Sequence, residues 1–361
     1  METRHRFIVG SAARLGDFRR DAVDLIVTSP PYPMIEMWDA TFAAQDPAIA
    51  AHIERGEGPE AFERMHQVLD AVWAECFRVL RPGGFACINI GDATRSIGGS
   101  FRLFTNHARI VTGCEALGFQ TLPTVLWRKQ TNAPNKFMGS GMLPSGAYVT
   151  LEHEHVLILR KGGNRTFGPD EKVRRTKSAF FWEERNTWFS DIWDLKGVQQ
   201  RLATDDARSR SGAFPFELPF RLISMYSMQE DLVLDPFVGT GTTILAAIAA
   251  GRSSIGVEID PALTPAVLRA VESGSSRINE RQLRRLRDHD EFVRVFRETR
   301  GQEPGHTNVP YDVPVVTRQE TGLVLAGVTD VRLVAERDDG VDWEASHEPL
   351  FDRGELQPEL F

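Results

Sequence analysis

The sequence predicts an α/β fold built on an open, mostly parallel sheet, and three observations support this. Apolar strand-like runs alternate with helical patterns along much of the 361-residue chain. One such run, 22–27, ends in a corner of two prolines, and another, 232–234, ends in an acid, a Gly-x-Gly turn and a helical pattern. In open α/β sheets, ligand chemistry gathers at the carboxyl ends of the strands, so both endings are candidate halves of a site.

Composition and charge set broad limits. The hydrophobic share of 42% and charged share of 25% are ordinary for a globular chain, and no apolar run approaches the roughly 20 residues that cross a bilayer. The cysteines Cys76, Cys87 and Cys114 have no CxxC spacing, which indicates reduced, buried residues. The net charge of −8 does not exclude nucleic acid, because 160–210 leans basic while acids dominate from residue 336 on, so any contact surface is local.

Hydrophobic periodicity places the expected elements in order. Strands are expected at 7–11, 22–27, 85–90, 121–128, 151–159, 232–234 and 254–260. Helices are expected at 60–80, 104–117, 217–228, 244–250 and 276–300. Strand-like pieces at 313–316 and 323–334 carry no functional signal. Residues 33–39 are too irregular for an assignment and are expected to form the floor or lid of a pocket.

The corner Thr28-Ser29-Pro30-Pro31-Tyr32 offers a specific chemistry. Prolines cannot donate to a sheet ladder, so the chain leaves the sheet here and forms a rigid turn. The Ser29 hydroxyl and the Pro30 carbonyl are hydrogen-bond acceptors, and Tyr32 adds a flat ring. Such a set suits the exocyclic amino group of a base turned out of a double helix. A plain proline-rich turn, or a ligand for an adaptor domain, is the alternative for this short motif.

The second ending has the form of a nucleotide site. Glycines at 239 and 241 let the backbone approach a ligand, and the helix start offers free N–H groups. Glu258, at the end of the next strand, is placed to accept hydrogen bonds from ribose hydroxyls. For Asp235, two roles are open: binding the ammonium group of a ligand, or holding the turn.

Both motifs resemble those of DNA amino-methyltransferases. Ser29-Pro30-Pro31-Tyr32 resembles the catalytic (S/T/D/N)-P-P-(Y/F) motif, and 235–243 resembles the S-adenosylmethionine loop of these enzymes. The order, with the corner first, resembles their β group and implies a Rossmann-like methyltransferase sheet with circularly permuted motif order, a small target-recognition insert and a C-terminal extension. The matched elements span 7–260, and Ser11 stands where an acid is often found.

The resemblance implies site residues and a division of the chain. The catalytic residues are Ser29, Pro30, Pro31 and Tyr32. The residues expected to bind S-adenosylmethionine are Ser11, Thr28, Asp235, Pro236, Phe237, Gly239, Gly241, Thr242, Thr243 and Glu258. The expected parts are a catalytic half at 1–160, a target-recognition region at 161–210, a cofactor-binding half at 211–275, and a C-terminal helix with an acidic extension at 276–361.

Residues 161–210 mix basic and aromatic side chains, which fits phosphate contacts combined with stacking. The residues expected to contact DNA are Arg165, Lys172, Arg174, Arg175, Lys177 and Arg185. The plainer interpretation is a small β-rich subdomain with an aromatic core, and the two are compatible. His153 and His155 share a strand face with no Cys or Asp expected nearby, so we expect a structural role and no metal.

The resemblance implies a site-specific DNA methyltransferase that uses S-adenosylmethionine and acts on double-stranded DNA. Serine in the first motif position favours cytosine N4 over adenine N6, and the lack of a Pro-Cys motif argues against cytosine C5 chemistry. A non-catalytic DNA-binding or regulatory protein with a retained cofactor pocket, and an enzyme acting on RNA or protein, are the alternatives. The family is compatible with a cognate restriction endonuclease, a homodimer and a cytoplasmic, nucleoid-associated location away from membranes.

Overall fold

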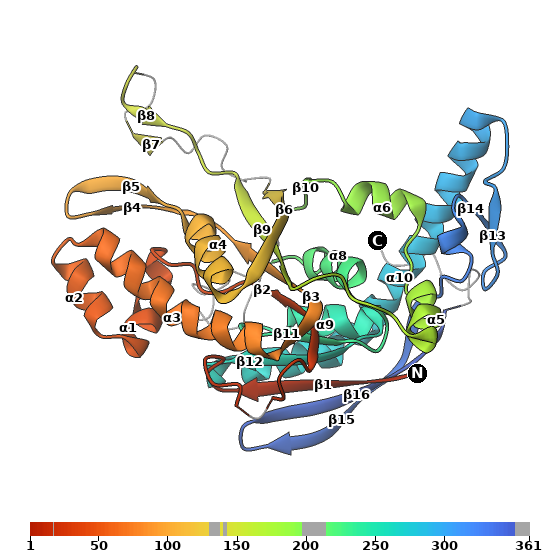
Figure 1. The fold of residues 1–361 in the computed structure, drawn as a ribbon, viewed down its shortest axis with the longest axis horizontal. Helices are drawn as coiled ribbons and strands as arrows, with labels where there is room; N and C mark the ends of the chain where they lie inside the picture. Colours follow the sequence, from red (N-terminus) through yellow and green to blue (C-terminus); the bar gives the residue numbers. More distant parts are fainter. Residues whose placement is uncertain (17, 130–137, 140–142, 197–213, 351–361) are drawn as a thin grey trace.

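A ten-stranded sheet forms the centre of the computed structural model (Figure 1), which describes residues 1–16, 18–129, 138–139, 143–196 and 214–350. Its strand order is β10-β6-β9-β3-β2-β11-β12-β1-β16-β15. The strands of this sheet are β1 Glu2–Val9, β2 Val23–Thr28, β3 Leu80–Ile90, β6 Phe119–Arg128, β9 His153–Lys161, β10 Ile192–Asp194, β11 Leu232–Asp235, β12 Ser253–Glu258, β15 Ala326–Arg337 and β16 Gly340–Pro349.

Smaller elements surround the sheet. Three two-stranded ladders are formed by β4 Ala93–Ile97 with β5 Ser100–Phe104, β7 Met138–Gly139 with β8 Ala147–Tyr148, and β13 His306–Asn308 with β14 Val313–Val315. The α-helices are α1 Asp39–Gln45, α2 Ala48–Glu54, α3 Gly58–Val79, α4 Asn106–Leu117, α5 Pro169–Lys177, α6 Trp182–Trp188, α8 Glu217–Tyr226, α9 Thr242–Ala250 and α10 Thr264–Arg300. Among the described residues, none of the helices combines the length and apolar character that a membrane span requires.

The central strands are parallel. β3, β2, β11, β12 and β1 pair with one another in that order, each in parallel register. Their carboxyl ends therefore meet at one side of the sheet, which we call the carboxyl edge; the opposite side is the amino edge. The predicted α/β fold with an open, mostly parallel sheet is confirmed.

Helices cover both faces of this sheet, and this explains why its strands are apolar throughout. Leu25 and Val27 of β2 belong to the core shared with α8 and α9. Ile26, between them, points to the other face and packs in the core shared with α3. A strand buried on both faces has no polar alternation, which is the pattern that predicted it.

The C-terminal segment differs from its prediction. α10 begins at Thr264 and runs through the expected boundary at 275/276. β16 pairs antiparallel with β1, and β15 pairs with β16, so residues 326–349 extend the main sheet instead of forming a separate acidic extension. The acids alternate with apolar residues: Val341, Trp343 and Ala345 are buried, while Asp342 lies 3.5 Å from an Arg6 guanidinium nitrogen. This period of two is that of a strand with one face buried, although the net charge of the segment is acidic.

Residues 161–196 also differ from the plainer interpretation of a β-rich subdomain. They form the two helices α5 and α6 and the single strand β10, which pairs with β6. Phe181, Trp188 and Trp193 are buried, so part of the aromatic content is core. Residues 197–213 of the predicted target-recognition region lie outside the described residues.

We predict that Trp343→Ala destabilises the whole domain. The side chain is buried on β16, which lies between β1 and β15, and removing a buried Trp costs about 3–5 kcal/mol. The free energy of unfolding from urea denaturation checks this. Val334→Thr on the exposed part of β15 is the control and should change it by less than about 0.5 kcal/mol. If Trp343→Ala also lowered the free energy of unfolding by less than about 0.5 kcal/mol, β16 would be an appendage that the domain does not depend on.

Candidate active site

A cavity of about 270 Å³ lies at the carboxyl edge and is lined by both sequence motifs. It brings together residues more than 200 positions apart in the chain, as the two motifs required. From the predicted set, it is lined by Ser11, Ser29, Pro30, Pro31, Tyr32, Asp235, Pro236, Phe237, Gly239, Thr242 and Glu258. Ile35, Met37 and Trp38 line it too, as expected for the segment after the corner. Gly10, Phe214, Asp260 and Leu263 are lining residues that the sequence did not single out.

Asp235 connects the two motifs. Thr28 Oγ1, at the end of β2, donates to Asp235 Oδ1 at 2.5 Å, and Thr243 Oγ1, at the start of α9, donates to Asp235 Oδ2 at 2.6 Å. The Phe237 amide also donates to Oδ1, at 3.0 Å. The carboxyl group is buried, and burial raises the pKa of Asp235 to about 6 against the opposing effect of its donors. Asp235 therefore holds the turn, while Oδ2 retains an acceptor direction that no described residue uses.

The glycine turn is formed by backbone that only glycine adopts readily. Gly239 has φ +54° and Gly241, which precedes α9, has φ +87°. A Cβ at Gly239 would meet no atom of the described residues within 4 Å, so the space beside its backbone is open. Its amide donates to Glu258 Oε2 at 3.0 Å, and the Asp260 amide donates to Glu258 Oε1 at 3.0 Å. Burial raises the pKa of Glu258, and each of its oxygens keeps room to accept from a ligand hydroxyl.

A hydrogen-bond network fixes the ring of Tyr32. The Tyr32 hydroxyl donates to Glu154 Oε2 at 2.8 Å and receives a hydrogen bond from Asn89 Nδ2 at 2.9 Å. Asn89 Nδ2 also donates to Glu154 Oε2 at 2.7 Å, and Lys129 forms an ion pair with Glu154. Ser29 Oγ lies 3.1 Å from the Tyr32 hydroxyl. Burial, followed by the Glu154 charge, raises the pKa of Tyr32 well above its ordinary value, so the phenol stays neutral.

Asn89, Lys129 and Glu154 were not predicted as site residues. Asn89 lies near the end of β3, and Glu154 lies near the start of β9, the antiparallel neighbour of β3. The signal was present in the sequence as polar residues at strand ends beside Trp127-x-Lys129 and His153-Glu154. Gly91 completes the arrangement, because a Cβ there would lie 3.0 Å from Tyr32 Cε2.

The six basic residues predicted to contact DNA do not form one surface beside this cavity. Arg165 pairs with Asp231 at 2.7 Å and with Asp24 at 3.4 Å, and Arg174 pairs with Asp231 at 3.2 Å. Asp24 precedes Ser29 by five residues along β2, a separation of about 16 Å at the rise of a strand. α5 thus lies at the amino edge (Figure 1), and the guanidinium of Arg165, with its side chain only 11% exposed, is held by protein carboxylates. α5 lies on the opposite side of the sheet from Ser29, and the prediction that these six residues contact DNA stays a prediction.

The other basic residues lie near this amino edge as well. Lys172, Arg175 and Arg185 line a cleft of about 970 Å³ together with Phe167, Trp182 and Phe189. Lys177 lies beside it on α5. The cleft exceeds the carboxyl-edge cavity in volume, but its lining, as far as the described residues show it, includes neither sequence motif.

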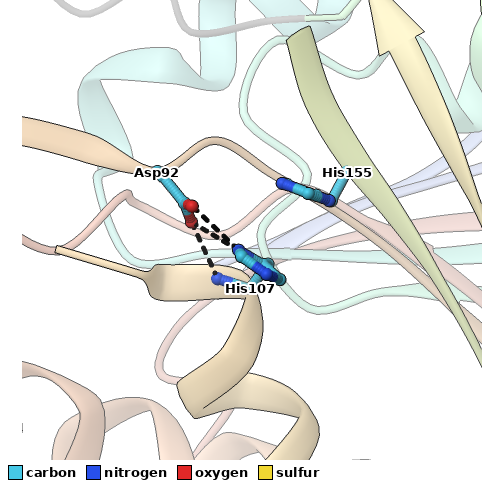
Figure 2. A group of neighbouring side chains, drawn as sticks. All are labelled: Asp92, His107 and His155. Atoms are coloured by element: carbon cyan, nitrogen blue, oxygen red, sulfur yellow. Dashed lines mark hydrogen bonds and ion pairs between the residues drawn. The ribbon is translucent and has the colours of Figure 1, made fainter. Parts of the chain in front are cut away.

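Three side chains of types that can bind a metal, those of Asp92, His107 and His155, lie together (Figure 2), and His155 follows Glu154 of the Tyr32 network in the chain. His107 Nδ1 lies 2.8 Å from Asp92 Oδ2, and the rings of His107 and His155 stack with centroids 3.9 Å apart and planes 15° apart. The expectation that no Cys or Asp lies near His153 and His155 is wrong, because Asp92, two residues after β3, belongs to this group. The nitrogen lone pairs of a histidine lie in the plane of its ring, and the ring planes of His107 and His155 are nearly parallel. In this arrangement one ion therefore cannot lie in both ring planes. Burial, then His107, lowers the pKa of His155 to about 4. The prediction that no metal is bound stays a prediction.

Comparisons with known proteins agree on one family. A family of DNA methylases that groups N6 and N4 enzymes matches residues 23–268. The Type II methyltransferase M.MthZI of Methanothermobacter thermautotrophicus is 47% identical over 90% of this chain and 91% of its own length. The Type II methyltransferase M.MjaI of Methanocaldococcus jannaschii is 50% identical over 73% of this chain and 90% of its own length.

A solved structure shows the same relationship. A DNA modification methylase from Thermus thermophilus, in complex with S-adenosyl-L-methionine, is 33% identical with a TM-score of 0.57. The similarity covers 76% of this chain and 93% of that one.

We predict that Glu154→Ala destabilises the fold by roughly 2 kcal/mol, because it leaves the buried donors of Asn89 and Tyr32 without their acceptor. Glu154→Gln, which keeps one acceptor oxygen, should lose less. Thermal or urea unfolding checks both variants. Glu152→Ala, an exposed site on the same segment, is the matched control and should be near neutral. Equal stability of Glu154→Ala and the wild type would contradict the network.

Proposed function

This chain belongs to the N6/N4 DNA methylase family, and from that premise we propose that it methylates the exocyclic N4 of cytosine at a specific DNA sequence. As a member, it is an S-adenosylmethionine-dependent DNA amino-methyltransferase. The observation that supports the cytosine assignment is the corner itself: a serine, not an acid or amide, lies beside Tyr32 at the cavity. Adenine N6 is the runner-up, since both bases present an amino group to the same two acceptors.

The cavity fits the cofactor. The open backbone at Gly239 gives room for a ligand, Glu258 has acceptor capacity for ribose hydroxyls, and Asp235 has it for an ammonium group. Phe237 and Leu263 provide apolar lining for an adenine ring. We propose these roles for the residues named. When bound, S-adenosylmethionine supplies an electrophilic methyl group on a sulfonium.

The corner residues prepare the amino group. The Pro30 carbonyl accepts no hydrogen bond within the described part of the chain, so it is available to a ligand donor. We propose that Ser29 Oγ and the Pro30 carbonyl accept the two amino hydrogens of the extruded base while its ring stacks on Tyr32. These bonds draw the nitrogen lone pair out of conjugation and stabilise the positive charge that develops on the nitrogen. Catalysis is then mainly positioning and electrostatic stabilisation.

The network behind Tyr32 has a positioning role in this proposal. Glu154 and Asn89 fix the hydroxyl end of the ring, so that its face is held toward the cavity. Because the phenol stays neutral, Tyr32 does not act as a base. The proton lost from the methylated nitrogen passes to solvent, so no titrating side chain is required as a catalytic base.

A non-catalytic role is the alternative of another class. It would require a cofactor pocket that serves only regulation or binding. The intact acceptor pair and the ordered Tyr32 network argue against it, because a protein that only binds the cofactor has no need of either.

The decisive experiment is incubation of the protein with labelled S-adenosylmethionine and mixed-sequence DNA, followed by nucleoside mass spectrometry. We predict N4-methylcytosine, and we predict that Ser29→Ala lowers kcat by about 10²-fold through loss of a transition-state acceptor. Cofactor affinity should stay within about threefold, because the proposed ligand contact of Ser29 is with the base and not with the cofactor. N6-methyladenine would overturn the base assignment alone. Bound cofactor with no methylated nucleoside would support the non-catalytic alternative.

Cofactor affinity should depend on pH through Asp235. Its raised pKa of about 6 means that the carboxyl is mostly protonated at about pH 5 and mostly ionised at about pH 7.5. An ammonium group favours the ionised form, so binding should weaken as the pH falls, by about tenfold over this range. Isothermal titration calorimetry with S-adenosylmethionine at several pH values measures this.

The matched variants separate the two acids of the cavity. Asp235→Asn should bind S-adenosylmethionine weakly at both pH values, without the pH dependence of the affinity. Glu258→Gln should also bind it more weakly than the wild type but should keep that pH dependence. If the affinity of Asp235→Asn for the cofactor kept the pH dependence of the wild type, Asp235 would not be the residue that binds the ammonium group.

A further inference from the structure

Two hairpin arms project from the carboxyl edge of the sheet (Figure 1). β4 and β5 form one arm, which begins just after β3 ends, and β7 and β8 form the other, which lies in the chain just before β9 begins. Within the described residues, each arm is a separate two-stranded ladder that does not pair with the main sheet. The ten-stranded sheet forms without strands from either arm, so pairing with that sheet does not explain the exposed surfaces of the arms.

The β4–β5 arm is held firmly on one face. Ile97 and Phe104 are buried and would touch a Cβ placed on Gly58, at the start of α3. Arg95 forms a bidentate ion pair with Asp39, with distances of 2.8 and 2.6 Å. The arm is thus anchored, and its other face is presented in a fixed orientation.

That other face is apolar and exposed. Phe101 is 37% exposed and Leu103 is 45% exposed, and strand alternation places both on the side away from Phe104. The Phe101 ring stacks on Tyr148 of the second arm, with centroids 4.8 Å apart and planes 26° apart. Tyr148 is 55% exposed, and Val149 beside it is 84% exposed. A paired aromatic surface left in water at the end of two arms is typical of a binding element.

The position of the arms relative to Tyr32 indicates the partner. Gly91, which packs against Tyr32, is two residues before β4, and Glu154, which bonds its hydroxyl, is six residues after Tyr148. The arms therefore extend from the two strands that hold the catalytic ring. A double helix that delivers a base to Tyr32 must lie over this edge, and the stacked pair lies there as well.

We propose that Phe101 and Tyr148 form an aromatic wedge that contacts double-stranded DNA beside the extruded base. This inference rests on the proposed function. Extruding a base breaks its pairing and stacking, and an apolar or aromatic side chain set against the disturbed step compensates part of that loss. Arg102 is exposed, and its guanidinium carbon lies 5.7 Å from the centroid of the Phe104 ring, on the face of β5 opposite Phe101.

Substrate pairing gives the sharpest test. Phe101→Ala and Tyr148→Ala are assayed in single-turnover methylation on a fully paired duplex and on the same duplex with the target base mispaired. A mispaired base is easier to extrude, so the wedge should matter less there. We expect a loss of about tenfold or more on the paired duplex and about threefold or less on the mispaired one. Val334→Ala, exposed on β15, is the control and should leave both rates unchanged.

A second readout does not require methyl transfer. Photocrosslinking of the wild-type protein to mixed-sequence duplex containing 5-iodouracil, followed by peptide mapping, should label the segments 93–104 and 143–151. Equal losses on paired and mispaired DNA, unchanged rates, or crosslinks confined to other segments would overturn the wedge. Crosslinks to the arms without any methylated nucleoside would contradict the proposed function and leave the DNA contact standing.

Discussion

The hydrogen bond between Thr28 and Asp235 is the interaction on which the site depends. It joins residues 207 positions apart, one at the end of β2 and one at the end of β11. These two strands pair through two residue pairs, Leu25 with Val233 and Ile26 with Leu234. The bond continues their association beyond the ladder, and it fixes Ser29, the next residue, relative to the glycine turn. Because Asp235 is buried, its two threonine donors and one amide donor are needed to hold it in place.

The other residues of the cavity come from the two segments that this hydrogen bond joins, one after β11 and one after β2. On the β11 side, the turn reaches α9 through glycines with positive φ, and Glu258 of β12 accepts from the turn's amide. On the β2 side, two prolines carry the chain out of the sheet to Tyr32, whose hydroxyl is fixed by Asn89 and Glu154. Both directions stay at the carboxyl edge because β2, β11 and β12 are parallel. The sheet direction therefore brings Ser29, Pro30 and the glycine turn to one cavity.

Much of this was predictable from sequence, and the reasons differ by element. Strands buried on both faces are continuous apolar runs, so β2 and β11 were evident, and α3 was evident from its helical spacing. The cavity residues were predictable because their motifs are local. The network of Asn89, Lys129 and Glu154 was not, because it depends on the antiparallel pairing of β9 with β3, which no local pattern specifies. The position of α5 at the amino edge was not predictable for the same reason: the basic residues were visible, but two of the carboxylates that hold Arg165, those of Asp24 and Asp231, are far away in the chain.

The central claim is that a base extruded from DNA meets its acceptors at Ser29 and Pro30 and its stacking surface at Tyr32. The most direct measurement is a crystal structure of the protein with duplex DNA and a non-reactive cofactor analogue. The account predicts the amino nitrogen of the extruded base within hydrogen-bond distance of Ser29 Oγ and the Pro30 carbonyl, with the ring on Tyr32. A base bound in the amino-edge cleft beside Arg175 and Trp182, or a duplex that does not cover the carboxyl edge, would contradict it.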